Sequence, residues 1–267
     1  MIKLFFYDNY NPIIDYFQEE GHNIPFLGSN LFDFTSFSIK RFADLNSQTL
    51  QIFTPPEWES EFESWSGNFL DYFGEDHSIF IFTDVFSVPL SDFTKEDYHF
   101  LIQNPDKIFH HESGMKIGYI NKNTDLSRVY KDELQGFNSI LRIEPSNFLK
   151  VNQSLISNFS SGQSYPGNYG NPVILTGGEN IHNSRILGPS FIGEDVKIYN
   201  SIIYPGTVVT GNCIISNSEV FESFICESSI RNSVVKNTLT AMANIDEVDL
   251  QDSIIPRGSV LNNVRKR

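Results

Sequence analysis

The feature that most constrains this chain is a repeat in its C-terminal part. The dipeptide Asn-Ser recurs, and each copy is followed within three residues by Ile or Val. The copies begin at Asn183, Asn200, Asn217 and Asn232, with Asp252-Ser253 as a weaker fifth. A six-residue period runs inside the longer one, through Ile186, Ile192 and Ile198 and then through Ile202, Val208, Ile214 and Val220. Short strands joined by tight turns repeat in this way, and three such strands close a triangular coil of roughly 18 residues.

This pattern predicts an all-β domain, a parallel β-helix of roughly five coils over residues 173–264. We expect the aliphatic residue of each repeat to point inward and small Ser and Gly residues to fit the corners. Asn side chains are expected to form ladders of amide hydrogen bonds along the stack. An antiparallel β-sandwich with many short strands is the alternative, which two nested periods in phase disfavour. The pattern resembles the hexapeptide-repeat left-handed parallel β-helix.

The first half of the chain alternates predicted strands and helices. The expected strands are residues 2–7, 50–53 and 79–82. The expected helices run from Pro12 to Gly21, from about Asn30 with Leu31, Phe34, Phe42 and Leu45 on one face, and from Pro55-Pro56 with Trp58, Phe62, Trp65, Phe69 and Phe73 in a stripe. This alternation predicts an α/β domain, a Rossmann-like parallel sheet with helices on both faces. Ligands of such sheets bind beyond the carboxyl ends of the strands, where Asp8 and Asp84 fall.

The two halves also differ in composition. Residues 1–150 contain 11 Lys and Arg against 23 Asp and Glu, a net charge of −12, whereas residues 151–267 contain 8 against 10, a net of −2. The total of −14 disfavours binding to nucleic acid or to an anionic membrane surface. A stretch rich in Ser, Gly, Asn and Pro predicts a linker at residues 158–172, between an α/β domain at 1–157 and the β-helix at 173–264.

The sequence indicates a cytoplasmic protein. No segment approaches the ~18 consecutive apolar residues of a membrane-spanning helix. The N-terminus has no small-residue cleavage site of a signal peptide. The two cysteines, Cys213 and Cys226, do not make a disulfide framework or a zinc site, and we expect them to pack as small buried apolar residues.

An α/β domain followed by a hexapeptide β-helix resembles the sugar-1-phosphate nucleotidyltransferases. This group includes the bifunctional N-acetylglucosamine-1-phosphate uridylyltransferase/glucosamine-1-phosphate acetyltransferase and the ADP-glucose pyrophosphorylases. Short matches are IPFLGSNLFDF at 24–34, LQIFTPP at 50–56, IFIFTD at 79–84 and PSNFLKVN at 145–152. The resemblance implies transfer of a nucleotidyl group from an NTP to a sugar 1-phosphate, with release of pyrophosphate. It further implies that Asp84 is catalytic and binds Mg²⁺, and that the nucleotide lies near Asp8, Asn9 and Asn11.

The sequence departs from that family where phosphate is bound. Nucleotidyl transfer needs a Gly-rich loop after the first strand, with a cation beside the triphosphate. Here the loop reads Asp8-Asn9-Tyr10-Asn11-Pro12, without glycine or cation, and His22-Asn23-Ile24 replaces the lysine that precedes Pro25 in the family. The domain is also shorter than a full transferase domain. A non-catalytic relative is therefore the alternative, acting as a scaffold, a regulatory subunit or a sensor of sugar nucleotides.

A third hypothesis rests on His182, at the entry to the β-helix. Acyltransferases of the hexapeptide class use a histidine as general base, with acyl-CoA bound between subunits. The β-helix is expected to assemble into a homotrimer, because its flat faces pack against copies of themselves. The pair His110-His111 is not expected to chelate a metal, because adjacent residues of a strand point to opposite faces.

Overall fold

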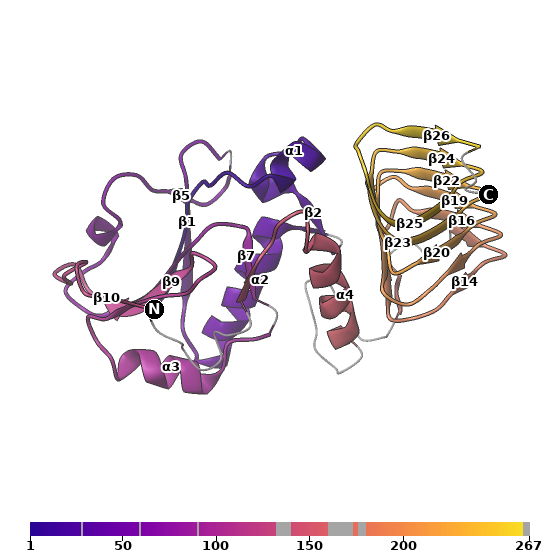
Figure 1. The fold of residues 1–267 in the computed structure, drawn as a ribbon. Coiled ribbons are helices and arrows are strands. Elements are labelled where there is room, and N and C mark those ends of the chain that lie inside the picture. The colour runs from indigo at the N-terminus through magenta and orange to yellow at the C-terminus, as the bar shows by residue number, and fades with distance from the viewer. Residues whose placement is uncertain are drawn as a thin grey trace. The chain divides into compact units, whose positions relative to one another are not determined.

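The structure is a computed structural model that describes residues 1–27, 29–58, 60–89, 91–131, 140–159, 173–175 and 180–263. The chain forms two compact units that are not continuous in sequence. The α/β unit consists of Met1–Asn11 and Leu31–Ile143, and the β-helix unit of Pro12–Asn30 and Glu144–Arg267. Figure 1 labels their elements. Among the described residues, no helix is both long and apolar enough to cross a membrane.

The α/β unit is built on one mixed sheet. Its elements are β1 (Ile2–Phe6), α2 (Leu31–Leu45), β4 (Leu50–Thr54), β5 (Glu63–Ser64), the 3₁₀ helix η2 (Phe69–Tyr72), β6 (Ser78–Thr83), β7 (Ser87–Pro89), α3 (Lys95–Ile102), β8 (Ile108–His110), β9 (Lys116–Ile120), β10 (Val129–Lys131) and β11 (Ile140–Arg142). The strand order is β10-β8-β9-β6-β1-β4-β5, and β7 pairs with β11 apart from it. The central strands β4, β1 and β6 are parallel, as predicted, whereas β9 runs antiparallel to both β6 and β8.

Helices cover one face of this sheet. Phe6 of β1 contacts Phe32 of α2, with ring centroids 4.8 Å apart, and Phe109 of β8 contacts Phe100 of α3 at 5.2 Å. Phe5, the neighbour of Phe6, points to the opposite face. That second face is covered by the segment between β4 and β6. The helix α2 buries its apolar stripe as predicted except at its last residue, Leu45, which is 46% exposed.

The segment after β4 corrects the sequence prediction of a third helix. Its described residues form β5 and η2 and no α-helix, with Gly67 at a φ of +78° between them. The predicted stripe makes separate contacts instead: Trp58 packs on Phe6, while Trp65 packs on Phe5. Because Phe5 and Phe6 lie on opposite faces of the sheet, one helix face could not reach both.

The β-helix unit contains the remaining elements. They are α1 (Ile13–Phe17), the 3₁₀ helix η1 (Gly21–Asn23), β2 (Pro25–Phe26), β3 (Ser29–Asn30), α4 (Phe148–Phe159), β12 (Val173–Leu175), β13 (Ile181–His182), β14 (Arg185–Ile186), β15 (Ser190–Ile192), β16 (Lys197–Tyr199), β17 (Ile202–Ile203), β18 (Thr207–Thr210), β19 (Ile214–Ser216), β20 (Glu219–Phe221), β21 (Phe224–Cys226), β22 (Ser229–Arg231), β23 (Val234–Ala241), β24 (Asn244–Asp246), β25 (Asp249–Ile255) and β26 (Val260–Asn262). From β12 onward the strands pair in parallel and form a β-helix of about five turns, which confirms the predicted fold.

The interior of the β-helix is a set of stacked aliphatic rows. Ile198, Ile215, Ile230 and Ile245 are register partners on successive coils, and each is at most 1% exposed. The step between them falls from 17 residues to 15. The first set of predicted inward residues is confirmed, since Ile192 and Ile198 lie in the core and Ile186 packs against it.

The second predicted set is wrong by one position for three of its four residues. The core contains Ile203, Val209 and Ile215 in place of Ile202, Val208 and Ile214, whereas Val220 is correctly placed. Each misplaced residue stands next to a second aliphatic residue, so the pattern does not fix the register, and a shift by one residue turns a side chain to the other face.

The later coils have a five-residue side rather than a six-residue one. Corner residues with φ between 44° and 54° recur every five residues, namely Asn217, Glu222, Glu227, Asn232, Asn237, Met242, Glu247 and Asp252. Three such sides make a coil of 15 residues.

Polar ladders run along the corners, as predicted. Asn183 Nδ2 donates to Asn200 Oδ1 at 2.7 Å, and the bond repeats from Asn200 to Asn217 and from Asn217 to Asn232, each at 3.2 Å. The serine of each pair adds a second ladder, in which the backbone N–H of Ser201 donates to Ser184 Oγ at 3.1 Å.

The helices α1 and α4 cover one side of the β-helix. Phe224 of β21 points outward yet is fully buried, because Phe148 of α4 and Phe17 of α1 pack on it at 4.9 and 6.2 Å. The hydroxyl of Tyr16 lies 2.8 Å from the carbonyl of Ile255. The predicted linker lies almost wholly outside the described residues, so the predicted domain boundaries stay a prediction.

Candidate functional site

Asp84, directly after β6, accepts four hydrogen bonds in the α/β unit. Its side chain is completely buried. Oδ1 accepts hydrogen bonds from the backbone N–H of Phe86 and from Ser87 Oγ, both at 3.0 Å. Oδ2 accepts from Asn9 Nδ2 at 2.9 Å and from the guanidinium of Arg142 at 2.7 Å. Both carboxylate oxygens are therefore satisfied by groups of the protein itself.

The sheet topology brings these residues together. β1 and β6 are parallel neighbours with Phe6 opposite Thr83, so the residues that follow them, Asn9 and Asp84, meet at one edge. Ser87 and Arg142 are opposite partners of the β7–β11 pair. We refer to Asn9, Asp84, Ser87 and Arg142 as the Asp84 cluster. The sequence predicts functional roles for Asn9 and Asp84, but not for Ser87 and Arg142.

Two further groups border the Asp84 cluster. Burial, with a smaller contribution from Asp84, raises the pKa of Tyr7 to about 12, although Arg142 opposes the shift. This phenol therefore stays protonated at neutral pH. The carbonyl of Ser113 lies 3.2 Å from the Arg142 guanidinium, which ties the turn between β8 and β9 to the cluster.

The surroundings of Asp84 suit an arginine counter-ion better than a metal. Magnesium requires about six oxygen ligands in octahedral geometry. Both oxygens of Asp84 already accept two hydrogen bonds each, one of them from a cation. Within the described ranges, no three His, Cys, Asp or Glu side chains gather as a metal site would require. The donor set does not fit Mg²⁺, and the metal role of Asp84 stays an untested prediction.

The loop after β1 is engaged with the protein. Asn11 is 1% exposed, and its amide donates to the carbonyl of Ile143 at 2.6 Å. Asn9 holds Asp84, as described above, whereas Asp8 lies at the surface. Two of the three predicted nucleotide-binding side chains thus have structural partners, and the third is an exposed carboxylate.

In the β-helix unit, His182 is exposed and its ring stacks on Tyr199 of the next coil, with centroids 5.4 Å apart. The residues that follow it border a shallow surface depression of about 470 Å³. This depression is lined by Asn183, Ser184, Arg185, Asn200, Ser201 and Ile202.

Both cysteines are buried, as expected, and Cys213 lies in the core of the coils. Both are free thiols. Burial raises the pKa of Cys213 to about 12 and also raises that of Cys226. The thiol of Cys213 accepts from the backbone N–H of Ser228 at 3.3 Å, and so takes the place that a serine hydroxyl has elsewhere in the ladders. We assign these thiols no chemical role.

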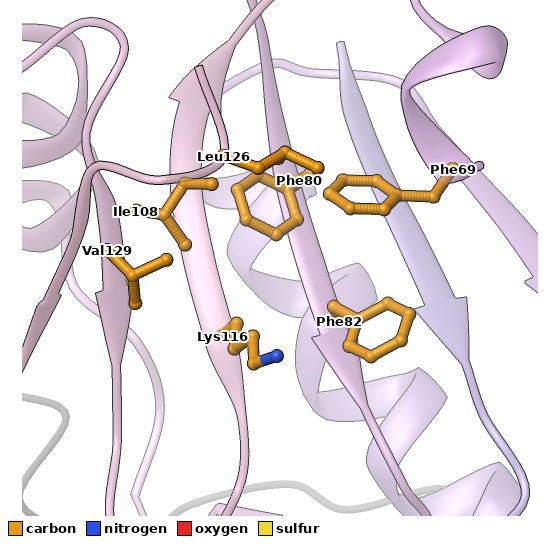
Figure 2. A pocket seen from close by; sticks show the side chains of 7 residues that line it. All are labelled: Phe69, Phe80, Phe82, Ile108, Lys116, Leu126 and Val129. Carbon is orange, nitrogen blue, oxygen red and sulfur yellow. The ribbon is translucent and has the colours of Figure 1, made fainter. Parts of the chain in front are cut away.

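A pocket opens on the sheet face opposite to α2 and α3, beside the 3₁₀ helix η2 (Figure 2). It measures about 150 Å³ and is lined by Phe69, Phe80, Phe82, Ile108, Lys116, Leu126 and Val129. Phe82 also stacks on Tyr7 with centroids 4.7 Å apart, which links the pocket to the border of the Asp84 cluster.

Comparison with known proteins adds no relative to this picture. No protein-family model matches the chain, and no curated protein matches its sequence. The resemblance to the nucleotidyltransferases is therefore carried by short motifs and by the β-helix fold.

Proposed function

We propose that this protein is a nucleotidyltransferase-like protein that has lost nucleotidyl transfer and acts by binding and assembly. The observation that carries the proposal is the ion pair between Asp84 and Arg142. Nucleotidyl transfer depends on cations that neutralise the charge developing on the phosphates. In the Asp84 cluster the carboxylate and the guanidinium neutralise each other, so neither offers its charge to a metal or to a triphosphate.

The loop after β1 supports the same proposal. A phosphate-binding loop presents backbone N–H groups around the phosphate, usually with glycines that permit the required turn. Residues 8–12 contain no glycine and no cation. The side chains of Asn9 and Asn11 donate hydrogen bonds to Asp84 and to the carbonyl of Ile143. The loop therefore stabilises the ends of the strands.

The β-helix supports the assembly part of the proposal. Its coils present apolar side chains to solvent at Tyr199, Val234, Met242 and Val260, which are 36 to 64% exposed. Flat sides of this kind pack against copies of themselves, and we propose a homotrimer. Size-exclusion chromatography with light scattering should then give three times the chain mass of 30.5 kDa. The buried free thiols suit the proposed cytoplasmic location.

The decisive assay is pyrophosphate release with Mg²⁺, over a panel of sugar 1-phosphates combined with ATP, GTP, CTP, UTP and dTTP. We expect no turnover above the rate without protein. Turnover that disappears in Asp84→Asn would overturn the proposal and establish the metal role of Asp84. Asp92→Asn is the matched control, because Asp92 also pairs with an arginine at 2.7 Å, but its side chain is 35% exposed whereas that of Asp84 is buried. Calorimetric titration with sugar nucleotides then measures binding without turnover.

A second candidate function is acyl transfer by the β-helix. It is favoured by the exposed ring of His182 next to the surface depression, since a general base must reach both solvent and substrate. The test is release of free thiol from acyl-CoA in the presence of amine and hydroxyl acceptors. Activity that is lost in His182→Asn would establish this function, whereas the absence of release over the panel would exclude it for those acceptors.

A further inference from the structure

One row of side chains crosses the sheet on the pocket face. The register places Phe5 opposite Phe82, Phe82 opposite Lys116, Lys116 opposite His110 and His110 opposite Lys131. Residues directly opposite each other on neighbouring strands point to the same face. The row is therefore aromatic over β1 and β6 and basic over β9, β8 and β10.

The pocket lies along this row and the next one. The adjacent row contains Phe80, Gly118, Ile108 and Val129. Gly118 is required here, because a Cβ at this position would lie 2.7 Å from the Phe80 ring and 2.5 Å from the carbonyl of Lys107. The absence of a side chain lets the Phe80 ring lie over β9 and shape the pocket.

The pocket has the size and character of a site for one ring. Its volume is about 150 Å³, and an apolar protein cavity of about this volume binds benzene. In Figure 2, Phe69 and Phe82 lie to one side, Ile108 and Val129 to the other, and the Lys116 ammonium is directed toward Phe82. That nitrogen is 5.6 Å from the Phe82 centroid. An occupant rich in hydroxyl groups would lose its hydration without gaining partners.

The basic end of the row stands out in an acidic unit. Residues 1–150 carry a net charge of −12. Nevertheless, no carboxylate among the described residues lies within ion-pair distance of Lys116 or Lys131. Burial lowers the pKa of His110, and the positive charges of Lys116 and Lys131 lower it further. A cationic surface of this kind attracts an anionic group.

We propose that this pocket binds a monocyclic aromatic acid, whose ring lies among Phe69, Phe80 and Phe82 and whose anionic group lies on Lys116. The ring would stack against aromatic side chains at their usual spacing. The acid group would form a charge-assisted hydrogen bond with the ammonium. This site is independent of the proposed loss of nucleotidyl transfer, since it uses none of the Asp84 cluster.

The test is a titration with four probes on the full chain. Benzoate carries ring and anion, benzyl alcohol the ring alone, acetate the anion alone, and glucose 1-phosphate an anion on a sugar. Binding can be followed by saturation-transfer NMR and by the emission of Trp65, whose ring contacts Phe82 at 5.6 Å. We expect benzoate to bind saturably, benzyl alcohol to bind about tenfold more weakly, and the other two not to saturate over the same range.

Three variants make the result specific. Lys116→Met should weaken benzoate binding about tenfold and leave benzyl alcohol unchanged. Lys122→Met is the matched control: it removes the same charge from an exposed lysine that pairs with Glu75, and should change neither affinity. Val129→Phe should fill the pocket and abolish binding of both ring probes, with the melting temperature as the check on folding.

Four results would overturn the proposal. They are the absence of saturable benzoate binding, equal affinities for benzoate and benzyl alcohol, equal losses in Lys116→Met and Lys122→Met, and full benzoate binding by a folded Val129→Phe variant.

Discussion

The two units satisfy their polar groups in opposite ways. In the α/β unit, Asp84 collects donors from the ends of β1 and β6, from β7 and from β11, and each contact occurs once. In the β-helix unit, the bond from one asparagine to the next is copied from coil to coil. Loss of one partner should therefore disrupt the whole Asp84 cluster, whereas loss of one asparagine should remove only the ladder hydrogen bonds of that coil.

The largest expected effect tests whether repetition also protects the apolar rows. Ile215 is fully buried and lies between Ile198 and Ile230 on the adjacent coils. Ile215→Ala should lower the free energy of unfolding by about 4 kcal/mol, because packed coils on both sides cannot collapse into the cavity. Leu261→Ala, in the last pairing of the row, should cost about 1 to 2 kcal/mol, because Leu261 is only partly buried. Equal costs in urea denaturation would show that position along the stack does not matter.

The next effect tests the single-copy cluster. Asp84→Ala should cost about 3 kcal/mol, because it leaves the Arg142 guanidinium, whose side chain is 28% exposed, without its carboxylate. Asp92→Ala should cost less than about 1 kcal/mol, since the Asp92 side chain is 35% exposed, whereas that of Asp84 is completely buried. The double variant Asp84→Ala/Arg142→Met should recover part of the loss. Denaturation experiments on Asp84→Ala, Arg142→Met and the double variant measure the coupling. If the costs of the two single variants add up to the cost of the double variant, the pair is not the organising contact that we describe.

A smaller effect separates the two roles of the ladder asparagines. Asn217 has a φ of 49° and bonds both neighbouring asparagines. Asn217→Ala should cost about 1 to 2 kcal/mol, and Asn217→Gly less, because glycine tolerates the left-handed conformation. Conversely, Met242→Asn should stabilise the coil by about 0.5 kcal/mol, since methionine is strained at a φ of 50°. Thermal unfolding of the three variants provides the measurement, and a destabilised Met242→Asn would contradict this account of the corners.

The smallest effect concerns pH. Burial lowers the pKa of His111 below its ordinary value near 6.5, and its Nδ1 accepts a hydrogen bond from the backbone N–H of Ser113, which a protonated ring could not do. The unfolded chain therefore binds the proton first as pH falls. The stabilisation is complete above about pH 6.5 and is lost as pH falls below that value through the lowered pKa of the folded state. His111→Asn keeps an acceptor and should flatten the slope of unfolding free energy over that interval; an unchanged slope would assign it to other groups.

The β-helix could be predicted from the sequence because its signals are local and repeated. Asn-Ser marks the same corner in four successive coils, and several copies outweigh an error in any one of them. The register failed only where two aliphatic residues are adjacent, as at Ile214-Ile215, since either can face the core. The sequence pattern did not predict the five-residue sides. Its last step, from Ile214 to Val220, begins at a residue that points outward, whereas the core residues Ile215 and Val220 are five apart.

The candidate site could be predicted only in part. Asn9 and Asp84 follow parallel strands, a position that local pattern reveals. Arg142 reaches Asp84 through the antiparallel pairing of β7 with β11, between segments some 50 residues apart that carry no local signal of each other. One signal was present, since Arg142 is a cation between apolar neighbours in an acidic half of the chain. The aromatic stripe after β4 gave a wrong prediction of a helix, because its side chains pack on different faces of one sheet.

The five-residue sides of the later coils also constrain how this chain can change in length. Each side advances the backbone by one third of a turn, so inserting or deleting five residues among the 15-residue coils would move every downstream strand onto the neighbouring side. An insertion or deletion of 15 residues keeps the alignment, because it adds or removes one complete coil. Insertions and deletions in this region should therefore be tolerated when they comprise whole coils, and should disrupt the fold when they comprise one or two sides of a coil.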